Sequence, residues 1–213
     1  MAGIFITLEG PDGAGKSTQA RMLASYLQSR GKEVFLTREP GGTLIAEKIR
    51  SILLEETDEE LAPLTEVLLY AASRAQHVAR LIKPALARGA VVISDRFVDS
   101  SIAYQGYGRG LDPELIWALN RPGLDGLLPH LTIILDVEPG VSKLRLDERN
   151  WRDGLDPDRL ELEKRDFHSR VRRGFLEMAA KEPERLHLVP AAGTVEEVHQ
   201  AVLEIVKRKF GFC

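Results

Sequence analysis

Residues 9–18 carry the residue types that cradle phosphate groups. Their sequence, EGPDGAGKST, fits the pattern G-x-x-x-x-G-K-[ST] between Gly10 and Ser17. In this pattern the glycines let backbone N–H groups converge on phosphate oxygens, the lysine reaches the outer phosphates, and the hydroxyl can bind Mg²⁺. The sequence thus predicts a site for a nucleoside triphosphate, formed by Gly10, Pro11, Asp12, Gly13, Ala14, Gly15, Lys16, Ser17 and Thr18.

The segments on either side of this loop support the prediction. Residues 4–8 are mostly β-branched or aromatic, which is typical of a buried strand. Residues 19–30 place apolar side chains along one face, as an amphipathic helix does. A chance glycine turn is the alternative. It is disfavoured because strand, glycine loop and helix occur in the order that is typical of a phosphate-binding P-loop.

Charged residues follow three other expected strands. Asp95 and Arg96 end the apolar run that begins at residue 90. The carboxylate of Asp95 can share a Mg²⁺ ion with Ser17, while the arginine can bind phosphate. Asp136 is a rival carboxylate that ranks second because it lacks an arginine beside it in the sequence. Arg38 begins a Pro-Gly-Gly loop and is a candidate anion clamp, although a surface arginine is the commoner outcome.

Polar and aromatic side chains farther along the chain could contact a nucleoside. Tyr70 and Arg74 lie four residues apart in an expected helix and share a face. A ring can stack on a base while a guanidinium bonds its edge, but periodicity alone favours a core tyrosine beside a surface arginine. The same choice, a nucleoside contact or an ordinary loop, applies to Ser100, Ser101, Tyr104 and Gln105.

Residues 149–158 are polar and broken by glycine and proline between two expected helices. Such an interruption predicts either a mobile lid or a solvated loop. Arg149 and Arg152 could bring positive charge over a bound nucleotide from this segment. Together with Lys16 and Arg96 they form the predicted catalytic set, since phosphoryl transfer depends mainly on positioning and charge stabilisation.

Apolar runs of strand length alternate with helical patterns throughout, so we expect one α/β domain over residues 1–213. The sheet should be parallel with helices on both faces, and the C-terminal ends of its strands should bring the site together. The expected strands are 4–8, 33–37, 90–95, 131–136 and 186–189. The expected helices are 19–30, 44–54, 64–88, 113–120, 141–148, 159–181 and 195–208.

The composition and charge of the chain argue against a nucleic-acid-binding or a membrane-spanning protein. Of the 213 residues, 44% are hydrophobic and 29% charged, as in ordinary globular proteins. The net charge of −3 gives no basic field for nucleic acid, and no apolar run has the length of a membrane span. The acidic run 55–60 is expected to be a solvated linker. The single cysteine, Cys213, excludes an internal disulfide and suits a reducing cytoplasm, and no signal peptide is expected.

The chain resembles bacterial thymidylate kinases, a family of P-loop nucleoside monophosphate kinases, in residues 12–18, 37–43, 95–96 and 103–106. The segment REPGGT is the most distinctive, and the likeness covers almost the whole chain. The resemblance implies a three-layer P-loop NTPase fold with a five-stranded parallel sheet and a lid. It also implies transfer of the γ-phosphate of ATP to dTMP, with Mg²⁺, for dTTP biosynthesis in a cytoplasmic homodimer.

By position, the resemblance implies roles for the residues near the sugar and phosphate of dTMP. Asp12 would touch the 3′-hydroxyl or help to place the phosphate, which Arg38 and Arg96 would hold. Tyr104 would press against the 2′ position of the sugar and disfavour ribonucleotides.

The resemblance also implies how the base is bound. Tyr70 stands where the family usually has a phenylalanine stacked on thymine. Arg74 would bond the thymine edge, with Ser101 and Gln105 nearby.

Some family members carry an arginine at the position of Gly13. This chain therefore looks like the subgroup that supplies its catalytic arginine from the lid, which makes Arg149 and Arg152 the candidates.

Other functions remain open at this point. A kinase for another nucleotide or for a deoxynucleoside would use the same fold, with Glu39 as a possible base in the second case. A GTP-dependent switch is disfavoured because the chain lacks an N-K-x-D motif. A regulatory protein without catalysis is disfavoured because Lys16, Ser17 and Asp95 are all present.

Overall fold

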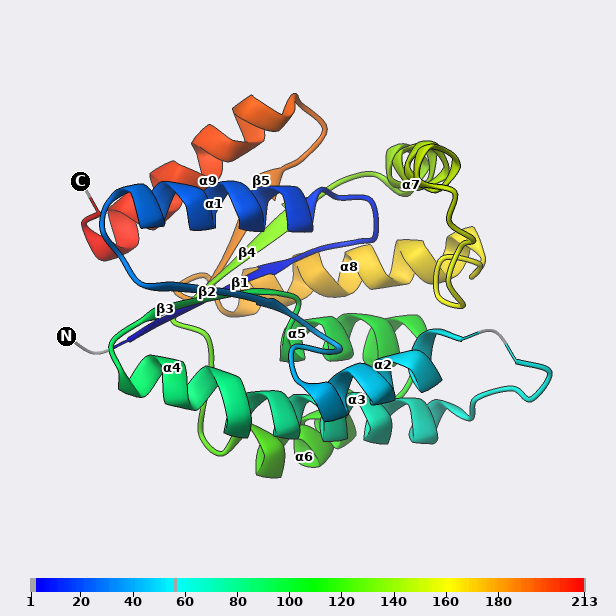
Figure 1. The fold of residues 1–213 in the computed structure, drawn as a ribbon. Coiled ribbons are helices and arrows are strands. Elements are labelled where there is room, and N and C mark those ends of the chain that lie inside the picture. Colours follow the sequence, from blue (N-terminus) through cyan, green and yellow to red (C-terminus); the bar gives the residue numbers. More distant parts are fainter. Residues whose placement is uncertain (1–2, 56, 213) are drawn as a thin grey trace.

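The computed structural model describes residues 3–55 and 57–212 and contains an all-parallel sheet in the order β2-β3-β1-β4-β5 (Figure 1). This confirms the predicted α/β fold with five parallel strands. The strands are β1 Ile4–Glu9, β2 Val34–Arg38, β3 Val91–Asp95, β4 Leu131–Asp136 and β5 Leu186–Pro190. Cys213, and Glu56 of the acidic run, lie outside the described residues.

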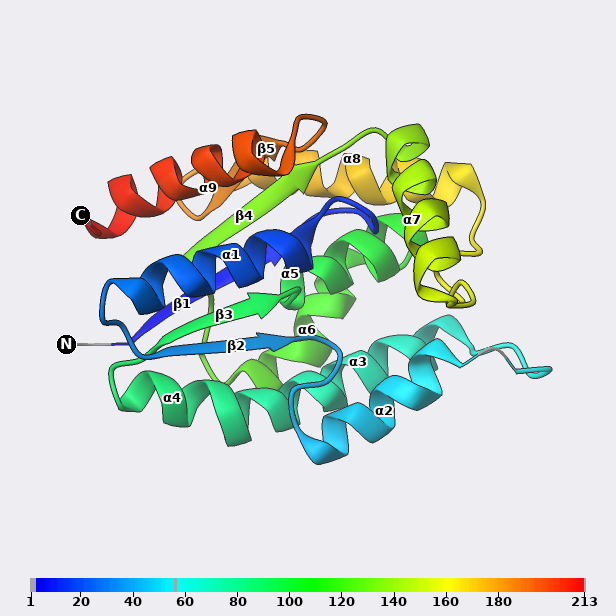
Figure 2. The ribbon, with the colours of Figure 1, turned by 45° about the horizontal axis from the view of Figure 1, so that its top comes forward.

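Helices cover both faces of the sheet, as the alternating pattern predicts (Figure 2). α1 (Lys16–Ser29) and α9 (Val195–Phe210) lie together on one face. The other helical segments are α2 Leu44–Leu54, α3 Pro63–His77, η1 Val78–Ile82, α4 Lys83–Ala87, α5 Val98–Ser101, η2 Ile102–Gly108, α6 Pro113–Leu124, α7 Pro139–Asp153 and α8 Arg165–Lys181. No helix in the part of the chain that the structure describes is long and apolar enough to cross a membrane.

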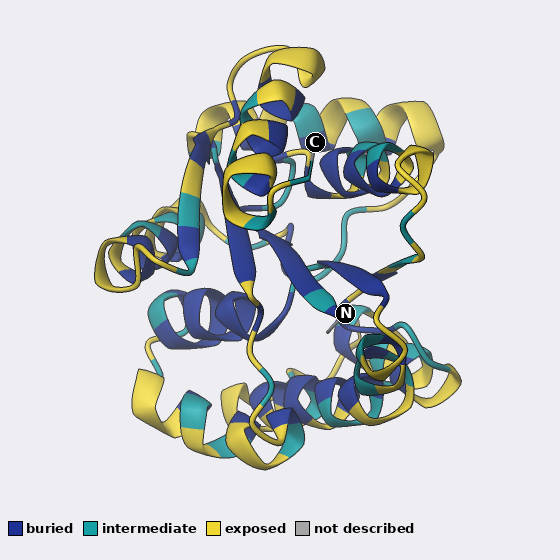
Figure 3. Cartoon of the chain, turned by 90° about the vertical axis from the view of Figure 1, so that its left-hand side faces the viewer, coloured by how far each residue is buried: buried dark blue, intermediate teal, exposed yellow. Residues whose placement is uncertain are grey.

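The three central strands, β1, β3 and β4, are buried on both faces because they are runs of mostly apolar residues, whereas the edge strands β2 and β5 are partly exposed (Figure 3). Ile6, Leu8 and Ile93 pack with α1 and α9, whereas Phe5 and Val92 pack into the opposite layer. Successive strand residues thus enter opposite layers. This packing fixes the C-terminal ends of the strands, where the predicted site residues lie.

Two segments differ from the expected pattern on the opposite face. The helix expected at 64–88 is divided by the π-helical turn η1. Pro84 lies in the first turn of α4, and a widened turn before it accommodates a residue that has no N–H and a bulky ring. η2 is helical, so the ordinary loop that the sequence left open for Tyr104 and Gln105 is wrong. A Cβ on Gly108 would lie 2.6 Å from the Phe167 ring, so this glycine serves close helix packing.

The interruption expected at 149–158 begins later than predicted. α7 continues to residue 153 and ends at Gly154, whose φ of 62° suits a left-handed C-cap. Arg149 and Arg152 are therefore helical. α8 begins at residue 165 rather than 159. The Asp158 carboxylate accepts hydrogen bonds from the backbone N–H groups of Leu160 and Glu161, at 2.9 and 3.0 Å, and so holds these residues in a turn.

Candidate active site

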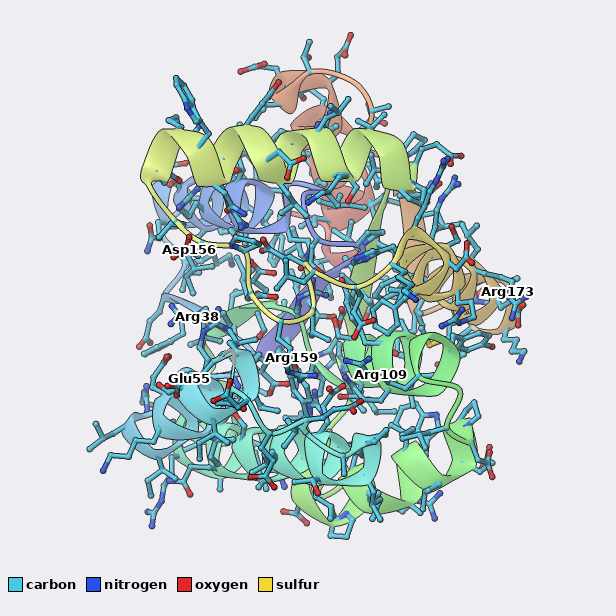
Figure 4. The ribbon with its side chains drawn as sticks, turned by 90° about the vertical axis from the view of Figure 1, so that its right-hand side faces the viewer. Arg38, Glu55, Arg109, Asp156, Arg159 and Arg173 are labelled. Carbon is cyan, nitrogen blue, oxygen red and sulfur yellow. The ribbon has the colours of Figure 1, made fainter. Side chains whose placement is uncertain are left out.

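The C-terminal ends of neighbouring strands bring most of the predicted site residues to one edge of the sheet. The phosphate-binding loop follows β1, which pairs with β3 so that Leu8 lies opposite Asp95. Figure 4 looks onto this side of the molecule, where α7 crosses above the segment that carries Arg159 and where Arg38 and Arg109 lie on either side of it.

The loop between β1 and α1 is shaped for phosphate binding. Gly10 and Gly13 have φ values of 131° and 75°, which favour glycine. Lys16 is buried, and its Nζ donates to the carbonyl oxygen of Pro11 at 2.7 Å. Burial and the nearby Arg96 guanidinium lower the pKa of Lys16 to about 8. A bound phosphate would favour the protonated ammonium, since an opposite charge nearby stabilises the charged form.

Helix α7 packs directly on this loop at Gly13. A Cβ at this position would lie 2.5 Å from the carbonyl oxygen of Ser142 and 3.1 Å from the side chain of Leu146. The Ser142 hydroxyl also donates to the carbonyl oxygen of Asp12. The packing leaves no room for an arginine at position 13.

Ser17 and Asp95 are side by side, as a shared Mg²⁺ ion requires. The Ser17 hydroxyl donates to Oδ2 of Asp95. The rival carboxylate, Asp136, instead accepts two bonds from Arg172, at 2.7 and 3.0 Å. Within residues 3–55 and 57–212, no three His, Cys, Asp or Glu side chains could together hold a metal. Ser17 and Asp95 nevertheless fit Mg²⁺, which proteins often bind through one or two oxygens plus substrate phosphates.

Arg96 joins the phosphate-binding loop to the space beside it. Its φ of 73° is a left-handed conformation that is costly for a residue with a Cβ and that occurs at functional sites. The guanidinium donates to the carbonyl oxygen of Gly10 at 3.2 Å, to Ser100 Oγ at 2.9 Å, to the Tyr104 hydroxyl at 2.9 Å and to Asp12.

Asp12 lies at the centre of this network. Tyr104 donates to its Oδ2 at 2.6 Å. Burial opposes ionisation, but Arg96 and Lys16, together with the Tyr104 hydrogen bond, hold the pKa of Asp12 well below its usual range. Asp12 therefore offers a charged acceptor at the edge of the phosphate-binding loop.

Glu9 is a buried acid to which the sequence assigns no role. Its carboxyl group accepts from the Phe97 N–H at 2.7 Å and from the Ser100 hydroxyl. Burial and the neighbouring Asp99 carboxylate raise the pKa of Glu9 to about 8. These bonds hold the turn that carries Arg96. The sequence feature that could have pointed to Glu9 is its position as an acidic residue at the end of a mostly apolar strand.

A pocket opens beside Arg96 and collects most of the residues predicted to contact the substrate. These lining residues are Asp12, Tyr70, Arg96, Ser100, Ser101, Tyr104 and Gln105. Six others complete the lining: Glu39, Pro40, Arg50, Leu54, Asp158 and Leu160. Arg50 adds positive charge, and its Nη1 donates to the carbonyl oxygen of Pro40 at 3.0 Å. Nothing in the sequence of α2 distinguishes Arg50 from its charged neighbours, so only the fold reveals it.

Arg38 and Arg74 do not line this pocket. Arg38 is half-exposed and pairs with Glu47 at 2.9 Å.

Arg74 is 2% exposed, so the alternative of a surface arginine at this position is wrong. Its guanidinium donates to Glu39 at 2.7 Å, to Ser101 at 3.1 Å, to the carbonyl oxygen of Phe97 at 3.1 Å and to the side chain of Asn120. Arg74 thus supports Ser101, which lines the pocket.

The two predicted lid arginines lie outside the pocket lining. Arg149 donates from Nη2 to Glu161 at 2.7 Å. Arg152 pairs with Asp153 at 2.8 Å, and its side chain is 70% exposed. The structure therefore places one arginine against the segment that follows α7 and the other toward solvent.

Comparisons with known proteins agree on one family. A family model described as thymidylate kinase matches residues 8–202. The chain is 49% identical to the thymidylate kinase of Geotalea uraniireducens over 206 residues, which cover 96% of each chain. It is 52% identical to that of Clavibacter sepedonicus over 198 residues, 93% of this chain and 91% of the relative. The crystal structure of thymidylate kinase from Ehrlichia chaffeensis matches with a TM-score of 0.77 at 38% identity and covers 97% of this chain and 99% of that one.

Proposed function

This chain belongs to the thymidylate kinase family and is a nucleoside monophosphate kinase, and we propose that its phosphate-binding loop holds ATP while the pocket beside Arg96 holds dTMP. The reaction transfers the γ-phosphate of ATP to dTMP and gives dTDP and ADP. The main support for this arrangement is the position of Arg96, because its guanidinium both contacts the phosphate-binding loop at Gly10 and lines the pocket. A cation there lies between the donor and the acceptor.

The proposed chemistry needs positive charge more than a base. A phosphate oxygen of dTMP attacks the γ-phosphorus, and the bond from that phosphorus to the bridging oxygen breaks, so that ADP leaves. The attacking oxygen is already ionised near neutral pH. Lys16 and Arg96 offset the repulsion between the two anionic reactants. Glu39 is engaged by Arg74 at 2.7 Å and His77 at 2.9 Å, which disfavours a nucleoside kinase that would use it as a base.

The residues around the pocket suit the base and sugar of dTMP. Asp12 would accept a hydrogen bond from the 3′-hydroxyl, because its low pKa keeps it a pure acceptor. Tyr104 would lie against the 2′ position, where an added hydroxyl would crowd its ring. Tyr70 lines the pocket and would stack on the base, with Ser100 and Ser101 beside it.

Three arginines would hold the dTMP phosphate. Arg96 already lies in the pocket, and Arg50 lines its rim. Arg38 would join them by leaving its exposed partner Glu47, an exchange with a small cost because exposed ion pairs are weak.

Ser17 and Asp95 would hold Mg²⁺ together with phosphate oxygens of ATP. The ion would neutralise charge on the β- and γ-phosphates. The hydrogen bond between the two residues keeps both oxygens directed to the same place.

Arg149 is the better placed of the two lid arginines. Its partner, Glu161, is buried in the segment that also supplies Asp158 and Leu160 to the pocket. We therefore assign to Arg149 the cation that approaches the transferred phosphoryl group when the segment closes. Closure of this segment stays a prediction.

The expected homodimer would form through α2 and α3. Four large apolar side chains on these helices are about half exposed: Ile45, Ile52, Leu64 and Leu68. Exposed apolar side chains on two helices that pack side by side commonly mark a protein interface. Leu68→Glu should then convert a dimer to a monomer in light scattering, and an unchanged mass would contradict this surface. The cytoplasmic location stays a prediction.

A coupled ADP-release assay tests the proposed substrate. ATP and Mg²⁺ are supplied with dTMP, dUMP, dCMP, dGMP, AMP or thymidine in parallel. We expect strong turnover with dTMP, weaker turnover with dUMP and negligible turnover with the others. Strong turnover with a different acceptor would retain the fold and the phosphoryl chemistry but overturn the roles given to Tyr70, Arg74 and Tyr104.

A further inference from the structure

Glu66 is a buried acid that the phosphoryl chemistry does not use. It lies in the first turn of α3 and is 0% exposed. Arg159 and Arg109 both contact its Oε2, at 2.6 and 3.3 Å, while Gln105 donates from Nε2 to its Oε1 at 2.8 Å. A carboxylate paired with two guanidinium groups accepts hydrogen bonds and donates none.

This contact decides how the Gln105 amide is oriented. The amide has a donor end and an acceptor end, and only the donor end can face Glu66. The acceptor, Oε1, is left for the pocket, which Gln105 lines. Within residues 3–55 and 57–212, no group donates a hydrogen bond to this oxygen, although Gln105 is only 1% exposed. This oxygen is not among the fully buried side-chain atoms without a partner, so it keeps access to the open pocket, where a ligand N–H could donate to it.

A complementary group lies one helical turn away. Ser101 and Gln105 are four residues apart and share a face of the helical segment α5–η2. Ser101 Oγ accepts from Arg74 at 3.1 Å, which leaves its hydroxyl hydrogen to donate. The pocket therefore presents a donor at Ser101 beside an acceptor at Gln105.

This pattern matches one class of pyrimidine. Thymine and uracil offer a carbonyl acceptor at O4 beside the N3–H donor. Cytosine offers the reverse, an amino donor at N4 beside an acceptor at N3. A cytosine in the same position would place acceptor against acceptor at Gln105 and donor against donor at Ser101.

We propose that Glu66 is a specificity-determining positioning residue, which fixes the Gln105 amide so that the pocket accepts an N3–H group and selects thymine and uracil over cytosine. Glu66 itself touches no substrate. The inference rests on the proposed placement of the dTMP base in this pocket.

The variant Glu66→Gln tests the proposal, because a glutamine at 66 can donate and lets Gln105 turn at little cost. The ratio of kcat/KM for dTMP to that for dCMP should fall about 10- to 100-fold. Most of the change should lie in the KM for dTMP, with the KM for ATP unchanged. In a Gln105→Ala background, Glu66→Gln should cause no further change in this ratio. Arg109→Gln is the matched control: it removes one partner of Glu66 but not Gln105, and should leave the ratio as it is.

An unchanged ratio in Glu66→Gln would overturn the proposal, as would an equal fall in the Gln105→Ala background. If Glu66→Gln does not fold, the wild-type enzyme still decides. It should use 3-methyl-dTMP, which lacks the N3 hydrogen, about 100-fold less well than dTMP, and should reject dCMP similarly. Equal use of either would overturn the role of Glu66. No turnover with dTMP at all would instead overturn the proposed function, and this inference with it.

Discussion

Removal of the Arg96 guanidinium should slow catalysis strongly without unfolding the protein. The change Arg96→Ala deletes donors to the phosphate-binding loop, Ser100, Tyr104 and Asp12 in one step. If Arg96 stabilises charge in the transition state, its loss should lower kcat about 10²- to 10³-fold, or about 3–4 kcal/mol. Arg96→Lys should recover only part of this rate, because an ammonium lacks the forked geometry that serves several acceptors.

The backbone of Arg96 adds a second, independent readout. At a φ of 73°, glycine is unstrained whereas alanine is not. Arg96→Gly should therefore unfold at a higher temperature than Arg96→Ala, by a difference of about 1 kcal/mol in the free energy of unfolding. Both variants should be equally slow, since both lack the guanidinium.

Steady-state ADP release with dTMP, together with thermal unfolding, measures both quantities. Arg172→Ala is the matched control, because Arg172 also binds a carboxylate, that of Asp136, but lies outside the pocket lining. Its kcat should stay within about twofold of wild type. A kcat within about fivefold of wild type for Arg96→Ala would refute the central role of this arginine.

Three further results are expected. Because the pKa of Lys16 is lowered to about 8, the free enzyme loses the phosphate-binding ammonium as the pH rises through 8. The KM for ATP should therefore rise about tenfold between pH 7 and pH 9. It should not rise in Lys16→Arg, because the guanidinium stays charged over this range. Arg74→Ala should weaken dTMP binding more than ATP binding in calorimetry, because Arg74 supports Ser101; an equal effect on both would argue against a role at the base. Arg149→Ala should be much slower than Arg152→Ala in the ADP-release assay, and the assignment of Arg149 fails if the two rates are alike.

Local patterns predicted the fold because each strand is a short apolar run between turn residues. The P-loop is equally local: its spacing places Ser17 in the first turn of α1, and the parallel pairing of β1 with β3 then puts Asp95 beside it. For Tyr104 and Gln105 the residues alone left a nucleoside contact and an ordinary loop equally open, and only the resemblance favoured the first; their segment is helical. Their approach to Asp12 and Glu66 depends on packing between distant segments.

The sequence alone could not predict how the arginine side chains around the pocket are oriented. Arg38, Arg50 and Arg74 are the same residue type, yet one is exposed, one lines the pocket and one is buried behind it. What separates them is the acceptor that each meets, and those acceptors come from other elements of the fold. The end of α7 differs from the prediction for a simpler reason: polar residues in 149–153 suggest a break, whereas the helix ends only at Gly154, where a left-handed residue is needed.

The proposed reaction can be followed through the transferred phosphoryl group itself. ATP labelled with ³²P at the γ position is incubated with dTMP, Mg²⁺ and the enzyme, and the products are separated by chromatography. We expect label in the β-phosphate of dTDP, in equal amount to the ADP formed, and a loss of rate of about 10²-fold or more in a Lys16→Ala variant that still unfolds cooperatively. Label in inorganic phosphate instead of dTDP, or a Lys16→Ala variant as fast as wild type, would contradict it.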